Sequence, residues 1–113
     1  MTDSPTRKGW RLENKVQHEL LDAGYTNVCR SPLSRGCWDV RGTIGPYTVY
    51  IQVKRGGYVS PAAWNQLYDF AEAQGAHALV AYPGPRGSGI QYRLITGRKA
   101  ERRRQPWTDW ELR

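Results

Sequence analysis

The sequence predicts an α/β fold, in which a mixed central β-sheet is flanked by helices. Two observations support this prediction. The hydrophobic patterns occur in the order α-β-β-β-α-β-β along the chain. In addition, the second helix lies between two strands, as in a crossover that joins parallel strands. With 113 residues, the chain is long enough for one domain with a core and too short for two.

Two segments have helical patterns. The first covers residues 8–22, follows residues 1–7, which are expected to be disordered, and has apolar residues at four-residue spacing. These are Leu12, Val16 and Leu20. The second begins at Ser60-Pro61, where serine suits the N-cap and proline the first helical position, and its expected C-cap is Gly75.

Five segments are predicted to be strands: 25–30, 38–44, 47–54, 77–82 and 90–95. Gly45-Pro46 between the second and third is interpreted as a two-residue hairpin loop. The residue numbers of two facing residues then add up to 91, which places Asp39 across from Gln52. Residues 97–113 form a basic C-terminal extension, in which the spacing of Trp107 and Trp110 predicts a short helix that docks on the body or on a partner chain.

The strand over residues 47–54 carries polar side chains on one face. Because side chains alternate along a strand, Gln52 and Lys54 share the face opposite the apolar one. A lysine in this place needs a partner or a role. With Asp39 across the hairpin, a carboxylate, an amide oxygen and an ammonium would converge, and this set can hold a hard metal ion beside a phosphate. Glu13, on the border of the first helix's apolar face, is a further candidate.

The charge balance predicts a polyanionic partner. The chain has 17 Lys and Arg against 10 Asp and Glu, a formal net charge of +7, and a pI near 9.8. The excess is clustered at the first helix and in the C-terminal region. These clusters contain Arg7, Lys8, Arg11 and Lys15, and Arg98, Lys99, Arg102, Arg103 and Arg104. Such clusters bind phosphates in a salt-sensitive, sequence-independent way, which favours a nucleic acid.

Other classes of protein find little support. The N-terminus is polar and no apolar run approaches membrane-spanning length, so an intracellular, cytoplasmic location is expected. Cys29 and Cys37 are interpreted as reduced thiols, because no second pair or His cluster completes a zinc set. The Gly-rich stretch 84–89 lacks the spacing of a phosphate-binding P-loop.

A series of short motifs resembles the archaeal-type Holliday junction resolvases, which are small homodimeric nucleases of the PD-(D/E)xK superfamily with a restriction-endonuclease-like fold. The resemblance covers roughly residues 7–82. The motifs are Arg7-Lys8-Gly9, Glu13, Gly24-Tyr25, Cys29-Arg30-Ser31, Ser34, Asp39-Val40 and Ile51-Gln52-Val53-Lys54.

The resemblance implies a metal-dependent endonuclease of DNA recombination and repair, which resolves four-way junctions by paired nicks. It makes Asp39 the central metal ligand, Lys54 the catalytic lysine, and Glu13 an acidic residue of the site. Ser34 and Arg30 would contact phosphate beside it. The implied metal is Mg²⁺, with Mn²⁺ as a substitute, bound by Asp39, Gln52 and Glu13. The DNA-binding candidates are Arg7, Lys8, Arg11, Arg30, Arg35, Arg55, Arg102, Arg103 and Arg104.

One residue departs from the family pattern. Gln52 occupies a position where the family has glutamate, and a Gln-x-Lys variant occurs in relatives such as Mrr-type restriction endonucleases. An amide oxygen can coordinate a divalent cation but brings no charge, so metal affinity should fall. Two alternatives therefore remain: a restriction- or repair-type nuclease that acts on other DNA, and a catalytically weakened DNA-binding module.

Overall fold

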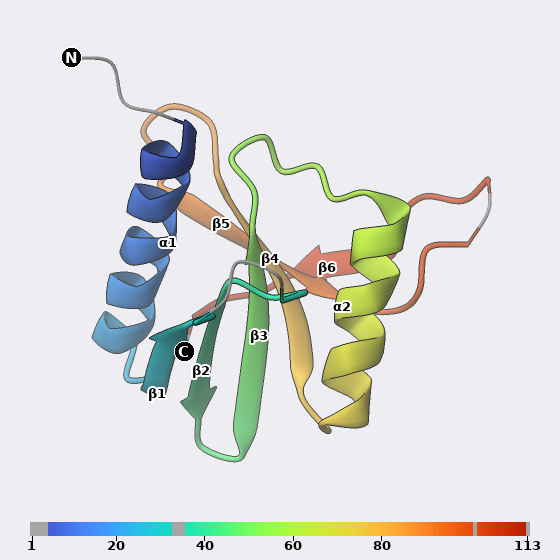
Figure 1. The fold of residues 1–113 in the computed structure, drawn as a ribbon, viewed down its shortest axis with the longest axis horizontal. Helices are drawn as coiled ribbons and strands as arrows, with labels where there is room; N and C mark the ends of the chain where they lie inside the picture. Colours follow the sequence, from blue (N-terminus) through green and yellow to red (C-terminus); the bar gives the residue numbers. More distant parts are fainter. Residues whose placement is uncertain (1–4, 33–35, 101, 113) are drawn as a thin grey trace.

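The computed structural model describes residues 5–32, 36–100 and 102–112, with only the backbone described for residues 5–10. It contains one six-stranded mixed sheet and two helices (Figure 1). The predicted α/β class and the predicted order of elements are confirmed, with one further strand. The elements are α1 (Pro5–Asp22), β1 (Thr26–Arg30), β2 (Val40–Ile44), β3 (Tyr47–Val53), α2 (Pro61–Ala73), β4 (His77–Pro83), β5 (Ile90–Ile95) and β6 (Trp107–Asp109).

The strands lie in the sheet in the same order as in the chain. Only β3 and β4 pair in parallel, and α2 connects them; the other neighbours are antiparallel. In the β2–β3 hairpin, Ile44 pairs with Tyr47 and Val40 with Ile51. These pairs sum to 91, so the predicted two-residue loop and its register are confirmed. Gly45 has a φ of 54° at this turn, a conformation that glycine adopts without strain.

The two helices cover opposite faces of the sheet, as the alternation along β3 shows. Val49 and Ile51 belong to a core with Val16 and Leu20 of α1. Tyr50, between them in the chain, belongs to a second core on the α2 side. The α2 residues in that second core are Trp64, Leu67 and Ala71. In Figure 1, α1 and α2 accordingly lie on the two sides of the strands.

The start of α2 follows the prediction closely. The hydroxyl of Ser60 accepts a hydrogen bond from the Ala63 N–H at 3.2 Å, and Pro61 is the first helical residue. Such a cap satisfies one of the N–H groups that lack a partner within the helix. Gln74, rather than Gly75, is the C-cap, and Gly75 follows it with a φ of 66°. In the described part of the chain, neither helix is long and apolar enough to cross a membrane.

Two boundary predictions need correction. Residues 5–7 were expected to be disordered but form the first turn of α1, where Pro5 suits the first helical position; residues 1–4 lie outside the described part. β2 begins at Val40 rather than at residue 38, because the backbone bends at Asp39.

The prediction of a short helix around Trp107 and Trp110 is wrong. Trp107 begins strand β6, which pairs with β5, and Trp110 follows this strand. The outer edge of β5 offers backbone N–H and C=O groups that a strand satisfies and a docked helix would leave open. Trp110 instead packs against the core on the α1 side, together with Leu112.

Candidate active site

Four charged side chains from four segments gather at one end of the sheet. Glu13 comes from α1, Arg30 ends β1, Asp39 precedes β2, and Lys54 follows β3. The ends of β1 and β3 and the start of β2 meet here, since Arg30 pairs with Val40 and Val40 with Ile51. Antiparallel pairing thus brings together residues that are far apart in the sequence.

Asp39 is held in its bend by three hydrogen bonds. Its N–H donates to the carbonyl of Ile51, and its own carbonyl accepts from the N–H of Ser31, both at 2.8 Å. Its carboxylate Oδ2 accepts from the N–H of Val53, also at 2.8 Å. The carboxylate is therefore fixed at the end of β3, one residue before Lys54.

Glu13 and Arg30 form a partly buried ion pair. A guanidinium nitrogen of Arg30 lies 3.2 Å from Oε2 of Glu13 and donates a hydrogen bond to it. The carboxyl groups of Glu13 and Asp39 are close enough for each to affect the pKa of the other. Arg30, predicted to contact phosphate, thus already has a role as the cation that holds the acidic pair.

The environment raises the pKa of both acids above its ordinary value. Burial raises the pKa of Asp39, and the Val53 N–H, the Lys54 ammonium and Arg30 offset part of this rise. Burial likewise raises the pKa of Glu13, and the nearby Asp39 carboxylate raises it further, against the lowering effect of Arg30. Two carboxylates brought together in a half-buried place thus leave negative charge that is not fully compensated.

This donor set fits a divalent cation. A cation between Glu13 and Asp39 would relieve the repulsion that raises the pKa values of these carboxyl groups, and hard cations prefer carboxylate oxygens. In the described ranges, no three His, Cys, Asp or Glu side chains gather into a metal-binding set. A third protein ligand would have to be of another type. The register places Gln52 beside Ile51 at this end of β3, half-buried and paired with Val80 of β4.

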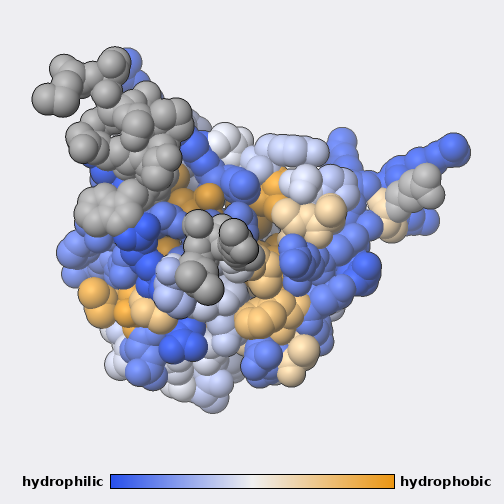
Figure 2. Space-filling model, viewed as in Figure 1, coloured by the Kyte–Doolittle hydropathy of each residue, from blue (hydrophilic) through white to orange (hydrophobic). Residues whose placement is uncertain are grey.

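Apart from Arg30, the residues predicted to contact DNA divide into three groups. Ser34 and Arg35 lie outside the described residues, and so do the side chains of Arg7 and Lys8. Arg11 is exposed on α1, and Arg55 is exposed directly after Lys54. The remaining three are exposed in a segment that we call the basic loop, residues 97–100 and 102–106, whose described residues contribute to the mostly hydrophilic projection at the right of Figure 2. They are Arg102, Arg103 and Arg104.

The basic loop is attached to α2 by polar contacts. Nε1 of Trp64 donates to the Gly97 carbonyl at 2.9 Å. The Asn65 amide accepts from the Lys99 N–H at 2.6 Å and donates to the Lys99 carbonyl at 3.5 Å. An ion pair between Arg98 and Asp69 adds to these bonds. The loop is thus held at a defined place beside α2.

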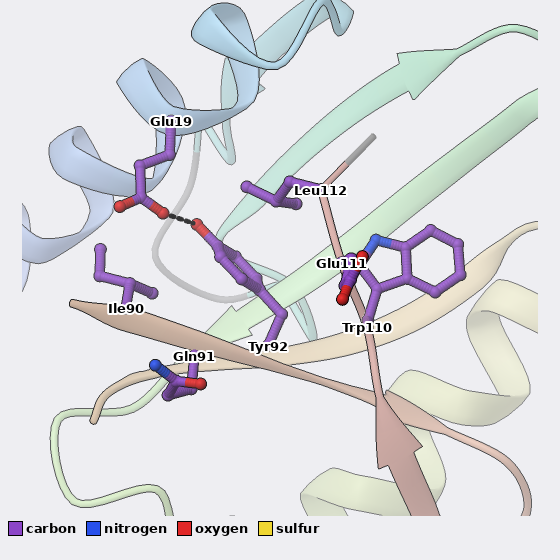
Figure 3. A pocket seen from close by; sticks show the side chains of 7 residues that line it. All are labelled: Glu19, Ile90, Gln91, Tyr92, Trp110, Glu111 and Leu112. Carbon is purple, nitrogen blue, oxygen red and sulfur yellow. Dashed lines mark hydrogen bonds between the residues drawn. The ribbon is translucent and has the colours of Figure 1, made fainter. Parts of the chain in front are cut away.

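A separate open pocket of about 350 Å³ lies between α1, β5 and the segment after β6 (Figure 3). The Tyr92 hydroxyl donates to the Glu19 carboxylate at 2.7 Å on its wall, and burial raises the pKa of Tyr92 far above its ordinary value. The rest of the lining comes from Ile90, Gln91, Trp110, Glu111 and Leu112. None of the predicted site residues lines this pocket.

Sequence reasoning missed a cation–π stack on the α2 side of the sheet. The Arg93 guanidinium lies 4.2 Å from the ring centre of Tyr82 and 4.4 Å from that of Trp107. The three residues come from β4, β5 and β6. The only available signal was an arginine between apolar residues in the strand 90–95, and its partners depended on a β6 that was not predicted.

A mixed sheet with two acids, an arginine and a lysine gathered at one end is an arrangement suited to phosphodiester chemistry. No protein-family model matches the sequence, and no curated protein matches it significantly. Among solved structures, the chain is similar to Hjc of Archaeoglobus fulgidus, a Holliday junction resolvase from an archaeal hyperthermophile. The TM-score is 0.64 at 30% identity, and the match covers 75% of this chain and 70% of that one.

The fold is therefore that of a junction-resolving nuclease. The chain belongs to the Hjc family of Holliday junction resolvases.

Proposed function

We propose that this protein is a Mg²⁺-dependent endonuclease that cuts four-way DNA junctions by paired nicks. The observation that carries the proposal is the Asp39 carboxylate, fixed by Val53 and flanked by Glu13, Arg30 and Lys54. The similarity to a Holliday junction resolvase supports the substrate. The motif Asp39…Gln52-Val53-Lys54 further supports a place in the PD-(D/E)xK superfamily, with glutamine at the variable position.

Each residue of the site would have its own role in cleavage. Asp39 and Glu13, with the amide oxygen of Gln52, would hold the metal, and Arg30 would keep the Glu13 carboxylate in place. When bound, Mg²⁺ or Mn²⁺ polarises the phosphate and lowers the pKa of a bound water. Lys54 would stabilise the negative charge that grows on the phosphate during attack, or orient the attacking water.

DNA binding would come from the basic residues around this site. Arg11 on α1, Arg55 after β3 and the three arginines of the basic loop are exposed and can pair with phosphates. A homodimer with twofold symmetry would present two such sites to strands of opposite polarity, as paired nicks require. In this proposal the chain acts as one nuclease domain inside the cell, where its DNA substrate lies.

The test is a nicking assay on a synthetic four-way junction with Mg²⁺, with flap and linear duplex DNA in parallel. We expect symmetric nicks in the junction, little cutting of the linear duplex, and no cutting by Asp39→Ala. Equal cutting of all three substrates would instead support a restriction- or repair-type nuclease.

Gln52 favours a second candidate, a DNA-binding module with weakened catalysis. This reading predicts tight, metal-independent junction binding by the wild-type protein and no nicking at any Mg²⁺ or Mn²⁺ concentration. The half-buried Lys54 argues against it, because a lysine is costly to place there without a role.

A further inference from the structure

The stack around Arg93 is built by the register of three strands. Arg93 pairs with Val80 of β4 and with Asp109 of β6, so Tyr82 and Trp107 are its diagonal neighbours on the same face. The guanidinium lies between the two rings, 4.2 and 4.4 Å from their centres. Its Nε is buried and, in the described part of the chain, has no hydrogen-bond partner. The rings therefore provide much of what holds the guanidinium.

This stack is connected to the loop that follows Lys54. The carbonyl of Gly57 lies 3.5 Å from a guanidinium nitrogen of Arg93 and accepts a hydrogen bond from it. Gly57 has a φ of 75°, and a Cβ there would meet the Tyr82 ring at 3.4 Å, so glycine suits both the turn and the close contact. The contact between Gly57 and the stack thus lies close to Lys54, which precedes Gly57 in the same loop.

A second contact brings the segment before Trp107 to the same place. The side-chain amide of Gln105 donates to the Val59 carbonyl at 2.6 Å. Tyr58 immediately precedes Val59, and Trp107 follows Gln105 by two residues. Tyr58 and Trp107 are therefore carried by two segments that touch each other beside Arg93.

Both of these aromatic residues are exposed. Tyr58 is 70% and Trp107 42% accessible to solvent, and they are two of the four exposed large hydrophobic residues among those the structure describes. Scattered surface aromatics need no explanation, but here Trp107 stacks on a guanidinium and Tyr58 lies in the segment that touches the one before Trp107, next to a candidate nuclease site. Arg55 and Arg104, also exposed, are close to them in sequence, and one acid, Asp109, faces Arg93.

We propose that Trp107 and Tyr58 form a platform on which a base that opens from its pair at the branch point of the DNA substrate stacks, beside the Lys54 site. This proposal rests on the proposed function for the presence of a DNA substrate and adds the feature of that DNA that is recognised. Every base has a π-face, so the platform would select unpaired nucleotides rather than a sequence. Arg93 would hold the Trp107 ring in place from behind, and the arginines around it would attract the phosphates.

The test measures equilibrium binding without metal, so that no cutting is needed. The probes are a single-stranded oligonucleotide containing 2-aminopurine and a fully paired duplex of the same length. We expect Trp107→Ala to weaken single-strand binding roughly tenfold, with duplex binding unchanged. The quenching of 2-aminopurine fluorescence should fall in parallel, and the slope of affinity against salt should stay the same, because stacking releases no counterions.

Three further variants make the result specific. Trp107→Phe should keep most of the single-strand affinity of the wild type. Tyr58→Ala should lose part of the affinity that Trp107→Ala loses, without affecting folding, because Tyr58 is more exposed than Trp107. Tyr47→Ala removes a comparably exposed aromatic residue, 52% accessible, at the opposite end of β3 and should change neither probe.

If Trp107→Ala lost as much affinity for the duplex as for the single strand, the platform would be overturned. A change of oligomeric state in Trp107→Ala would also overturn it, and would make the Trp107 surface a contact between two copies of the chain. Wild-type protein that binds neither these probes nor a four-way junction would overturn the proposed function itself, whereas binding to the junction alone would overturn only the platform. Wild-type and Trp107→Ala proteins that bind both probes equally would overturn only the platform.

Discussion

The carboxylate of Asp39 accepts a hydrogen bond from the backbone N–H of Val53 at 2.8 Å, across the open end of the β2–β3 hairpin. This bond uses an N–H at the last residue of β3 and fixes the carboxylate one residue from Lys54. Because the donor is backbone, the orientation of the acid depends on the sheet and not on another flexible side chain. The bond also offsets part of the effect of burial on the pKa of Asp39.

Catalysis and DNA binding should separate in two variants. Asp39→Asn and Lys54→Ala should each lower cleavage by at least about 100-fold, because each removes a charge that acts on the metal or on the phosphate. Metal-free binding to a junction, measured by gel shift, should stay close to that of the wild type, because the exposed arginines remain. A loss of binding as large as the loss of cleavage would contradict this division.

The role of Gln52 can be decided by a metal titration. Gln52→Glu should move half-maximal activity to lower Mg²⁺ concentration, because it adds a full charge to a set with two acids. Gln52→Leu, similar in size but without the oxygen, should lose most activity. Equal half-saturation points for wild type and Gln52→Glu would mean that Gln52 lies outside the coordination shell.

The stability of the metal-free protein should fall as pH rises through the range in which Glu13 and Asp39 ionise. Both pKa values are raised in the folded state, so the folded protein holds protons that the unfolded chain releases from about pH 4 upward. The stability that these two protonated acids contribute is fully present below about pH 4. It is lost as the pH rises through the raised pKa values of the folded state. Urea unfolding in EDTA from pH 4 to 8 measures it.

The variant that checks this prediction is Asp39→Asn, whose amide oxygen can still accept from Val53. At pH 7 to 8 without metal it should be more stable than the wild type, and its stability should depend less on pH. Mg²⁺ should reduce or reverse the difference, because it stabilises only the form with the carboxylate. A wild type more stable than Asp39→Asn in EDTA would show that the pKa shift of Asp39 runs the other way.

The basic loop gives a prediction that separates charge from attachment. Replacing Arg102, Arg103 and Arg104 together by Gln should reduce the steepness of the plot of log affinity against log salt concentration. If each arginine contacts a phosphate, the slope should change by about 2 to 3.

Asn65→Ala should act on the same loop differently. It removes two bonds to the Lys99 backbone, about 1 kcal/mol of stability, while leaving the three charges in place. Binding should weaken with little change in salt slope. Gln66→Ala, an exposed neighbour on α2, is the matched control and should change neither quantity.

Much of this site could be predicted from local patterns. The Gly45-Pro46 loop gave the correct register of the hairpin, and helical spacing placed Glu13 at the edge of the face that packs on the sheet. These predictions succeeded because turn type and side-chain periodicity are local properties of the chain. The bend at Asp39 was not visible, because it depends on hydrogen bonds from Ser31 and Val53, which lie in other segments.

Contacts between distant segments were the part that could not be predicted. The Glu13–Arg30 ion pair needs α1 and the end of β1 to lie side by side, and the sequence gives no measure of that distance. Trp107 was assigned to a helix because its spacing from Trp110 fits one helical face. Trp107 instead lies in a strand, because the free edge of β5 needs a hydrogen-bonding partner. This strand also brings the Trp107 ring onto Arg93.

The strand order has a consequence for how the chain folds. Every strand pairs with the one before it in the sequence, so the sheet can grow by one strand at a time as the chain leaves the ribosome. Only the β3–β4 step must wait for a helix, because a parallel pair needs the α2 crossover. Neighbour-by-neighbour pairing keeps most contacts short-range, and such topologies reach their transition state quickly. We therefore expect the hairpin that carries Asp39 and Lys54 to form before β4 is available to pair with it.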